Sequence, residues 1–194
     1  VIDPLTALGL QEIFMQIFIG VLLGTLLQVV SAALIVGGQA ISASMGLSMA
    51  NMVDPNMGNV PVIAQFLIIC STLIFLALGG HIIVISLLLE SFQLMPIGEM
   101  FEAQPLMALI IQWSSMMFLG AVLLALPIMV SLLLINIGLG VITRAAPALN
   151  IFAVGFPAMI LAGIILLSMS MSSIGFRIQW LWQESFKIMN QADR

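Results

Sequence analysis

The sequence has very few charged residues. Asp, Glu, Lys and Arg make up 6% of the 194 residues and hydrophobic residues make up 62%, whereas a soluble globular domain carries about 25% charged residues. The eight acids and four bases leave four stretches without charge, at residues 13–53, 55–89, 103–143 and 145–176. Each is longer than the roughly 20 helical residues that cross a hydrocarbon core about 30 Å thick. The chain is therefore a polytopic membrane protein in contact with lipid, and a basic nucleic-acid-binding surface is excluded.

The apolar stretches lack the alternation of polar and apolar residues that is typical of barrel strands. Backbone groups in lipid must be paired within a helix or a closed barrel, and here helices are favoured. We therefore predict an all-α, polytopic integral membrane protein. Pro127 interrupts the third long helix, either as a kink or as the bend between two half-helices. The predicted helices cover residues 10–36, 61–90, 106–142 and 150–174, followed by an amphipathic C-terminal segment, 176–194, that lies at a membrane or complex surface.

The basic residues do not define a membrane topology. Arg144 and Arg177 stand at the two ends of one apolar helix, so a crossing helix cannot place both on the cytoplasmic side. Either the topology is irregular or the helices form hairpins supported by partner subunits. Arg144 suits a loop charge at an interface or a contact to a partner. Gly20 and Gly24 have the spacing at which membrane helices approach one another closely.

Cysteine and histidine occur once each. A lone Cys70 excludes an internal disulfide and a cysteine-based metal site. On one continuous helix, Glu90 would lie on the face opposite His81, and Cys70 would lie roughly 16 Å from it along the axis. We expect His81 to make a hydrogen bond within a helix bundle, with a gating or proton-sensitive role as the alternative. Since no phosphate loop or zinc spacing occurs either, the sequence predicts neither an enzyme nor a cofactor or metal.

Residues 37–60 form the least lipid-like long segment, rich in Gly, Ser, Asn and Met. Asp54 and Pro55 begin a predicted turn, in which Asp54 is either a turn carboxylate or a group involved in gating. The segment also has methionines at helical spacing, which suit ordinary packing or a deformable seal around a pore. These methionines are Met45, Met49 and Met52, with Met57 close by.

Three segments resemble the FliR family of flagellar type III export-gate proteins. Residues 39–65 contain MGLSMA, VDP and VPV, residues 73–81 read LIFLALGGH, and residues 144–157 read RAAPALNIFAVGFP. The segments follow the family order, and the resemblance covers nearly the whole chain. Gly79 stands where the family often has Asn, and Ala148 where Gln is common, which weakens a polar contact at those two positions.

The resemblance implies a single domain over residues 1–194 that lacks the N-terminal helices of the family and belongs to a hetero-oligomeric gate in the bacterial inner membrane, at the flagellar basal body. It implies FliP and FliQ as partners, FlhB nearby, and unfolded flagellar subunits as the exported cargo. Residues 37–60 would then be a plug or constriction loop. The candidate plug residues are Gly37, Gly38, Met45, Gly46, Met49, Met52, Asp54, Pro55, Met57 and Gly58. The candidate structural or subunit contacts are Gly20, Gly24, His81, Arg144, Pro147, Asn150, Gly155 and Pro157.

Other functions fit the sequence less well. The injectisome secretion-gate subunit SctT shares the fold expected from the resemblance, but the segment over residues 144–157 is more similar to the flagellar proteins. A small-solute transporter should show inverted repeats and ionisable groups near mid-span, and neither is evident in this sequence. An intramembrane enzyme is disfavoured by the missing catalytic pair.

Overall fold

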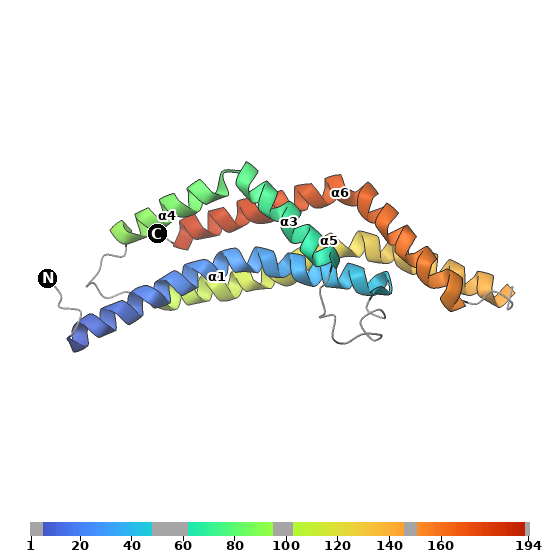
Figure 1. Cartoon of the computed structure of the whole chain (residues 1–194). Coiled ribbons are helices and arrows are strands. Elements are labelled where there is room, and N and C mark those ends of the chain that lie inside the picture. The colour runs from blue at the N-terminus through green and yellow to red at the C-terminus, as the bar shows by residue number, and fades with distance from the viewer. Residues whose placement is uncertain (1–5, 48–61, 95–102, 146–150, 193–194) are drawn as a thin grey trace.

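The computed structural model describes residues 6–47, 62–94, 103–145 and 151–192, and these ranges are helical apart from short turns (Figure 1). They contain no strand, which confirms the all-α prediction. The helices are α1 (Ala7–Ser44), α3 (Val62–Ala77), α4 (Gly80–Leu94), α5 (Ala103–Ala145) and α6 (Ile151–Ala192).

The helices form two consecutive hairpins, α1 with α3–α4 and α5 with α6. The long helices α1 and α5 run in the same direction, because Leu26 meets Trp113 whereas Gly37, further along α1, meets Ala121, further along α5. α6 runs antiparallel to α1, since Leu26 meets Ser185 whereas Met45, further along the chain, meets Gly163, earlier in α6. In Figure 1 the α3–α4 pair and α6 return over α1 and α5, and α1 begins at the same end of the molecule at which α4 and α6 end.

Three helices of the described ranges, α1, α5 and α6, are long and apolar enough to cross a membrane, or four if the bent α3–α4 pair counts as one span. α1, α5 and α6 have 38, 43 and 42 residues, which correspond to roughly 57 to 65 Å at 1.5 Å per residue. One hydrocarbon core needs about half that length. These helices therefore extend well beyond a single crossing.

The predicted end of the first helix at Val36 is wrong, because α1 continues to Ser44. Gly37 and Gly38 lie within the helix at its closest contacts. A Cβ on Gly37 would stand 3.2 Å from the carbonyl oxygen of Ala121, and one on Gly38 would stand 2.5 Å from the Cα of Ala64. In a membrane protein such glycines let helix backbones approach one another. Here they serve this packing role inside α1 and do not end the helix.

The single helix predicted over residues 61–90 is also wrong, because it is two helices bent by 67°. Gly79 has φ +71°, a left-handed conformation that glycine adopts without strain. Its N–H donates to the carbonyl of Leu76, and its own carbonyl accepts the N–H groups of Ile82 and Ile83, which start α4. A Cβ on Gly80 would collide with the ring of Phe75. Gly79 and Gly80 therefore produce the bend between α3 and α4.

Two proline-bearing helices are continuous. Pro127 lies inside α5, so the alternative of two half-helices is excluded. A proline removes its own N–H donor, and it is tolerated where the rest of a long helix is held by its neighbours. Pro157 lies inside α6, which also contains the predicted amphipathic stretch. The predicted end of the last long helix at residue 174 is thus wrong, because α6 continues to Ala192.

Buried hydrogen bonds connect the two hairpins. The indole Nε1 of Trp113 donates to the carbonyl of Leu26 at 3.0 Å, and the hydroxyl of Ser185 donates to the same carbonyl at 3.4 Å. The indole Nε1 of Trp182 donates to the hydroxyl of Ser71 at 2.8 Å. α1, α3, α5 and α6 are thereby fixed at one level of the bundle.

Rings reinforce this connection beside the α3–α4 bend. Phe75 lies with its ring centroid 4.7 Å from that of Trp182 and 5.9 Å from that of Phe186. The amphipathic stretch of α6 was predicted to face a membrane or complex surface, yet Trp182 and its neighbours Ile178 and Ser185 are buried in the bundle. One face of this stretch therefore belongs to the core of the chain.

Replacing Gly38 by Ala should destabilise the isolated chain by about 1–3 kcal/mol, because the new methyl group has no space beside the backbone of Ala64. Gly24→Ala is the matched control on the same helix. No other part of the described chain lies within 4 Å of a Cβ at Gly24, so that change should stabilise the helix by about 0.5–1 kcal/mol. Thermal unfolding in detergent measures both, and equal melting temperatures would contradict the close α1–α3 packing.

Ser71→Ala should cost about 1–3 kcal/mol, because it leaves the buried indole N–H of Trp182 without an acceptor. In the double variant with Trp182→Phe, the loss should be smaller than the sum of the two single losses. Ser86→Ala, an exposed hydroxyl on α4, should change stability by no more than about 0.5 kcal/mol. A double-mutant cycle of melting temperatures tests the pair, and strict additivity would argue against the hydrogen bond.

Candidate functional site

The described residues hold no assembled catalytic or metal-binding group. Within the described ranges, no set of three or more His, Cys, Asp or Glu side chains lies close enough together to hold a metal. His81 follows the α3–α4 bend and is exposed, and no hydrogen bond joins it to another described residue. The predicted hydrogen bond of His81 within the helix bundle is therefore not formed in the described part of this chain.

The bend also changes the relation between His81 and the two residues considered with it. Cys70 lies on α3 and Glu90 on α4, so only Glu90 shares a helix with His81. Both His81 and Glu90 are exposed. The sequence argument for a single straight helix therefore does not apply to Cys70.

Only part of the candidate plug falls within the described residues. Gly37 and Gly38 are buried packing positions in α1, and Met45 and Gly46 form the turn after it. The other candidates lie outside the described residues, namely Met49, Met52, Asp54, Pro55, Met57 and Gly58.

The end of α1 is held tightly by α6. Met45 is 1% exposed, and its side chain fills the space beside Gly163, where a Cβ would stand 2.5 Å from Cε. Gly46 has φ +80° and lies against the ring of Phe156. Met45 thus packs as a core residue, one of the two roles considered for the methionines.

The candidate contact residues that are described lie mostly on open faces. Gly20 and Gly24 are exposed, and no other part of the described chain approaches them within 4 Å of a Cβ position. Arg144 is exposed in the last turn of α5, where the helix dipole favours a cation. Pro157 is exposed in α6. Pro147 and Asn150 lie outside the described residues.

A groove between α1 and α5 is lined by small and apolar side chains. Its volume is about 640 Å³, and Ala40, Ala43, Ala121 and Ala125 lie along it. A second cavity of about 320 Å³ adjoins it, sharing Ser44, Asn136 and Met159 and including Gly155. Small residues let another helix approach closely, so the groove is suited to an apolar helix or side chain from outside the chain.

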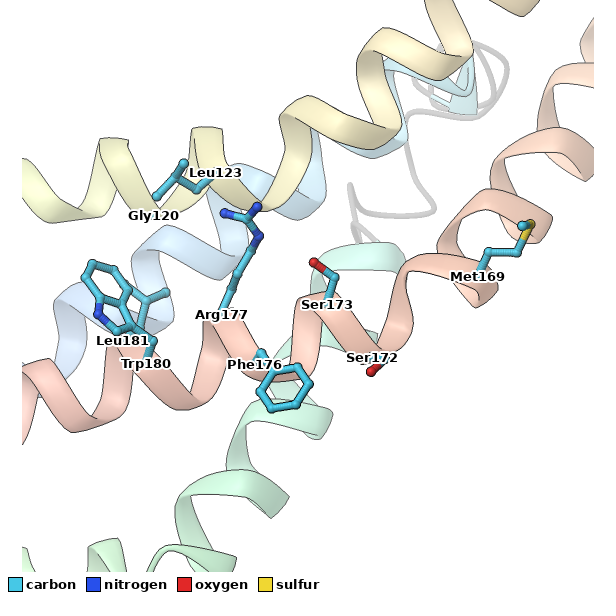
Figure 2. Close-up of a pocket in the computed structure, with 9 residues that line it drawn as sticks. All are labelled: Gly120, Leu123, Met169, Ser172, Ser173, Phe176, Arg177, Trp180 and Leu181. Carbon is cyan, nitrogen blue, oxygen red and sulfur yellow. The ribbon is translucent and has the colours of Figure 1, made fainter.

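A third cavity, of about 670 Å³, lies between α5 and α6. Figure 2 shows the side chain of Arg177 extending from α6 toward α5, with Ser173 pointing the same way one turn before it. Trp180 also lines the cavity, together with the apolar side chains of Leu123 and Leu181. The arrangement combines hydrogen-bond donors with an apolar wall.

Most of the apolar surface of these helices is not covered by other residues of the described ranges. The most apolar windows of α1, α5 and α6 are only 33%, 33% and 17% buried. The whole chain exposes 12194 Å², whereas a compact soluble protein of the same 20.8 kDa exposes about 9,000 Å². Lipid or other subunits must therefore cover a large surface.

Sequence reasoning missed the residues that join the hairpins. Trp113, Trp182, Ser71 and Ser185 were not singled out, although a Trp in an apolar run carries an N–H that needs an acceptor when buried. That rule was a usable signal for Trp113. The cavity around Arg177 was missed because its walls come from two helices that are distant in the sequence.

Comparison with known proteins gives consistent matches over nearly the whole chain. Residues 2–185 match the family described as "Bacterial export proteins, family 1". The chain is similar to the flagellar biosynthetic protein FliR of Escherichia coli K12, with 39% identity over 176 residues that cover 90% of this chain and 67% of the relative. The FliR of Pectobacterium carotovorum is 38% identical over 186 residues, covering 93% and 70%. The FliR of Aquifex aeolicus is 32% identical over 175 residues, covering 89% and 67%.

Proposed function

The chain belongs to the FliR family of bacterial export proteins, and on that basis we propose that it is a noncatalytic subunit of the flagellar type III export gate. With FliP and FliQ it forms the channel through which unfolded flagellar subunits pass during assembly of the flagellum. The gate lies in the bacterial inner membrane at the flagellar basal body, with FlhB nearby. The relatives described above are all flagellar, which favours this gate over that of the injectisome.

The uncovered apolar surface of the long helices carries the proposal. A self-contained transporter would bury the faces of its spans against one another, whereas α6 has only 17% of its most apolar window buried. These helices also exceed the length of one crossing about twofold. Neighbouring subunits would cover the exposed apolar faces of these helices and the parts of the helices that extend beyond the hydrocarbon core of a bilayer.

Two features of the chain suit contacts with such neighbours. The open pair Gly20 and Gly24 offers a face on which a helix backbone can approach. The groove along Ala40, Ala43 and Ala121 offers a second such surface between α1 and α5. We assign FliP and FliQ helices to these surfaces.

We further propose that the plug consists of the residues after α1, up to residue 60. Residues 37–44 belong to α1 and pack against α3 and α5, so they are poorly suited to movement. Gly38 and Ala64 are in close contact, which brings together the helices on either side of this segment. Its first end is held against α6, because Met45 packs on Gly163 and Gly46 lies against the ring of Phe156. A replacement confined to residues 48–60 therefore leaves the contacts of the helices on either side in place.

The subunit assignment predicts that FliP and FliQ copurify with the tagged full-length protein in mild detergent. Gly24→Leu should reduce their recovery about tenfold, because a large side chain blocks the approach of a partner helix. Gly24→Ala should reduce it less, and neither change should unfold the chain, since nothing lies within 4 Å of a Cβ there. Mass spectrometry of the copurified proteins measures the recovery. Purification of the wild-type protein alone, or as a homodimer, would overturn the assignment.

The plug assignment predicts ion leakage when residues 48–60 are replaced by a shorter Gly/Ser linker. Assembly with FliP and FliQ should be unchanged, because the helices on either side are held by their own contacts. Conductance of the assembled complex in a planar bilayer measures the leak. A normally assembled complex that conducts no more than wild type would exclude these residues as the plug.

A further inference from the structure

Three side chains on one face of α6 have hydrogen-bond donors without acceptors. Ser173, Arg177 and Trp180 follow one another at spacings of four and three residues and line the same cavity. No hydrogen bond or ion pair joins any of them to another residue within the described ranges. The indoles of Trp113 and Trp182, by contrast, both donate to acceptors in the bundle.

Many other hydroxyls on these helices form hydrogen bonds, unlike the hydroxyl of Ser173. Many donate to the carbonyl three or four residues earlier, which is the usual solution in an apolar helix. They include Thr25, Ser44, Thr72, Ser86, Ser91, Ser114, Ser115, Ser131 and Thr143. The hydroxyl of Ser173 therefore remains available to a ligand in the cavity.

The remainder of the cavity wall is apolar. Leu123 from α5 and Met169, Phe176 and Leu181 from α6 line it, and the described residues of its lining include no carboxylate. Met169 is 78% exposed and Phe176 is 71% exposed, so the cavity opens onto the outer apolar surface of α6. A fitting ligand has an anionic, acceptor-rich group for the donors and an apolar body for the wall.

The position of Arg177 along the sequence corresponds to the depth of lipid headgroups. It is the first charge after the uncharged residues 145–176, and Trp180 follows one turn later. Arg and Trp in this order are typical of the boundary between hydrocarbon and water. On α5, the distance from Leu123 at the cavity to Arg144 is 21 residues, or about 31 Å, which matches one hydrocarbon core.

We propose that this cavity binds an anionic phospholipid. The guanidinium of Arg177 donates to the phosphodiester, Ser173 and Trp180, about one turn to either side of it, donate to other oxygens of the headgroup and glycerol backbone, and the acyl chains lie along Leu123 and Phe176. A zwitterionic headgroup would bring an ammonium for which the lining has no carboxylate. An anionic phospholipid supplies both an acceptor group for the donors and acyl chains for the apolar wall at Met169 and Phe176, whereas a carboxylate from a protein partner supplies only the acceptor. The proposal does not depend on the export role of the chain.

Native mass spectrometry of the full-length protein in detergent, titrated with phosphatidylglycerol or phosphatidylethanolamine, tests the site. Phosphatidylglycerol should bind more tightly than phosphatidylethanolamine. Arg177→Gln should weaken phosphatidylglycerol binding about tenfold, the loss expected for one charge-assisted hydrogen-bonded pair. Lys187→Gln is the matched control, because it removes one positive charge from the same helix at a lysine that pairs with Glu184 outside the cavity. It should leave binding unchanged.

Equal losses in Arg177→Gln and Lys187→Gln, or no loss in either, would overturn the site. A photoreactive amino acid at Phe176, activated in living cells, distinguishes the occupants. A lipid adduct is expected, and an adduct to another protein as the main product would assign the cavity to a protein partner instead. Because copurification of FliP and FliQ is measured separately, failure of the lipid site and failure of the export-gate assignment give different results.

Discussion

The carbonyl of Leu26 is the point on which the arrangement of the helices depends. It lies in the middle of α1 and accepts the indole of Trp113 from α5 and the hydroxyl of Ser185 from α6. In a chain with so few polar side chains, a buried donor has few acceptors to choose from, and an unmade hydrogen bond is costly. Apolar packing alone permits many registers between long helices. These two donors select one register for α5 and α6 against α1.

The small residues of the bundle become important once that register is set. Gly37 and Gly38 bring α1 against α5 and α3, and Gly163 receives the side chain of Met45. Each close contact lies at a position where a larger side chain would collide. The hydrogen bonds thus define the level at which the helices meet, and the glycines define how closely they meet. Together they produce a fixed inner bundle whose outer surface is still apolar and uncovered.

The sequence predicted the helices correctly, but it predicted the ends of the helices and the contacts between them poorly. Charge-free runs identify long helices whatever the helices touch, which is why the all-α fold followed from composition. The predicted end at Val36 relied on glycine as a loop residue, whereas Gly37 and Gly38 serve packing, and among the described residues Gly46 and Gly79 have positive φ and lie in turns. Helices that are apolar on all sides also give no periodic signal for their inner face. For that reason the sequence identified Gly20 and Gly24 as a motif for helix contact. It did not show that no other helix of the described chain packs on them. Most of the candidate plug residues fall within residues 48–61, which lie outside the described structure. Their role as a plug remains a prediction.

The shared direction of α1 and α5 has a consequence for biogenesis. Each long helix is followed by a return limb, so α1 begins and α4 ends at one end of the molecule, where α5 also begins and α6 ends (Figure 1). The two hairpins therefore enter and leave from the same side and can be delivered to the membrane as two successive units of like orientation. Neither unit needs the other to return its chain to the starting side. The second must still slide along the first until Trp113 reaches Leu26. Insertion and docking are thus separable steps.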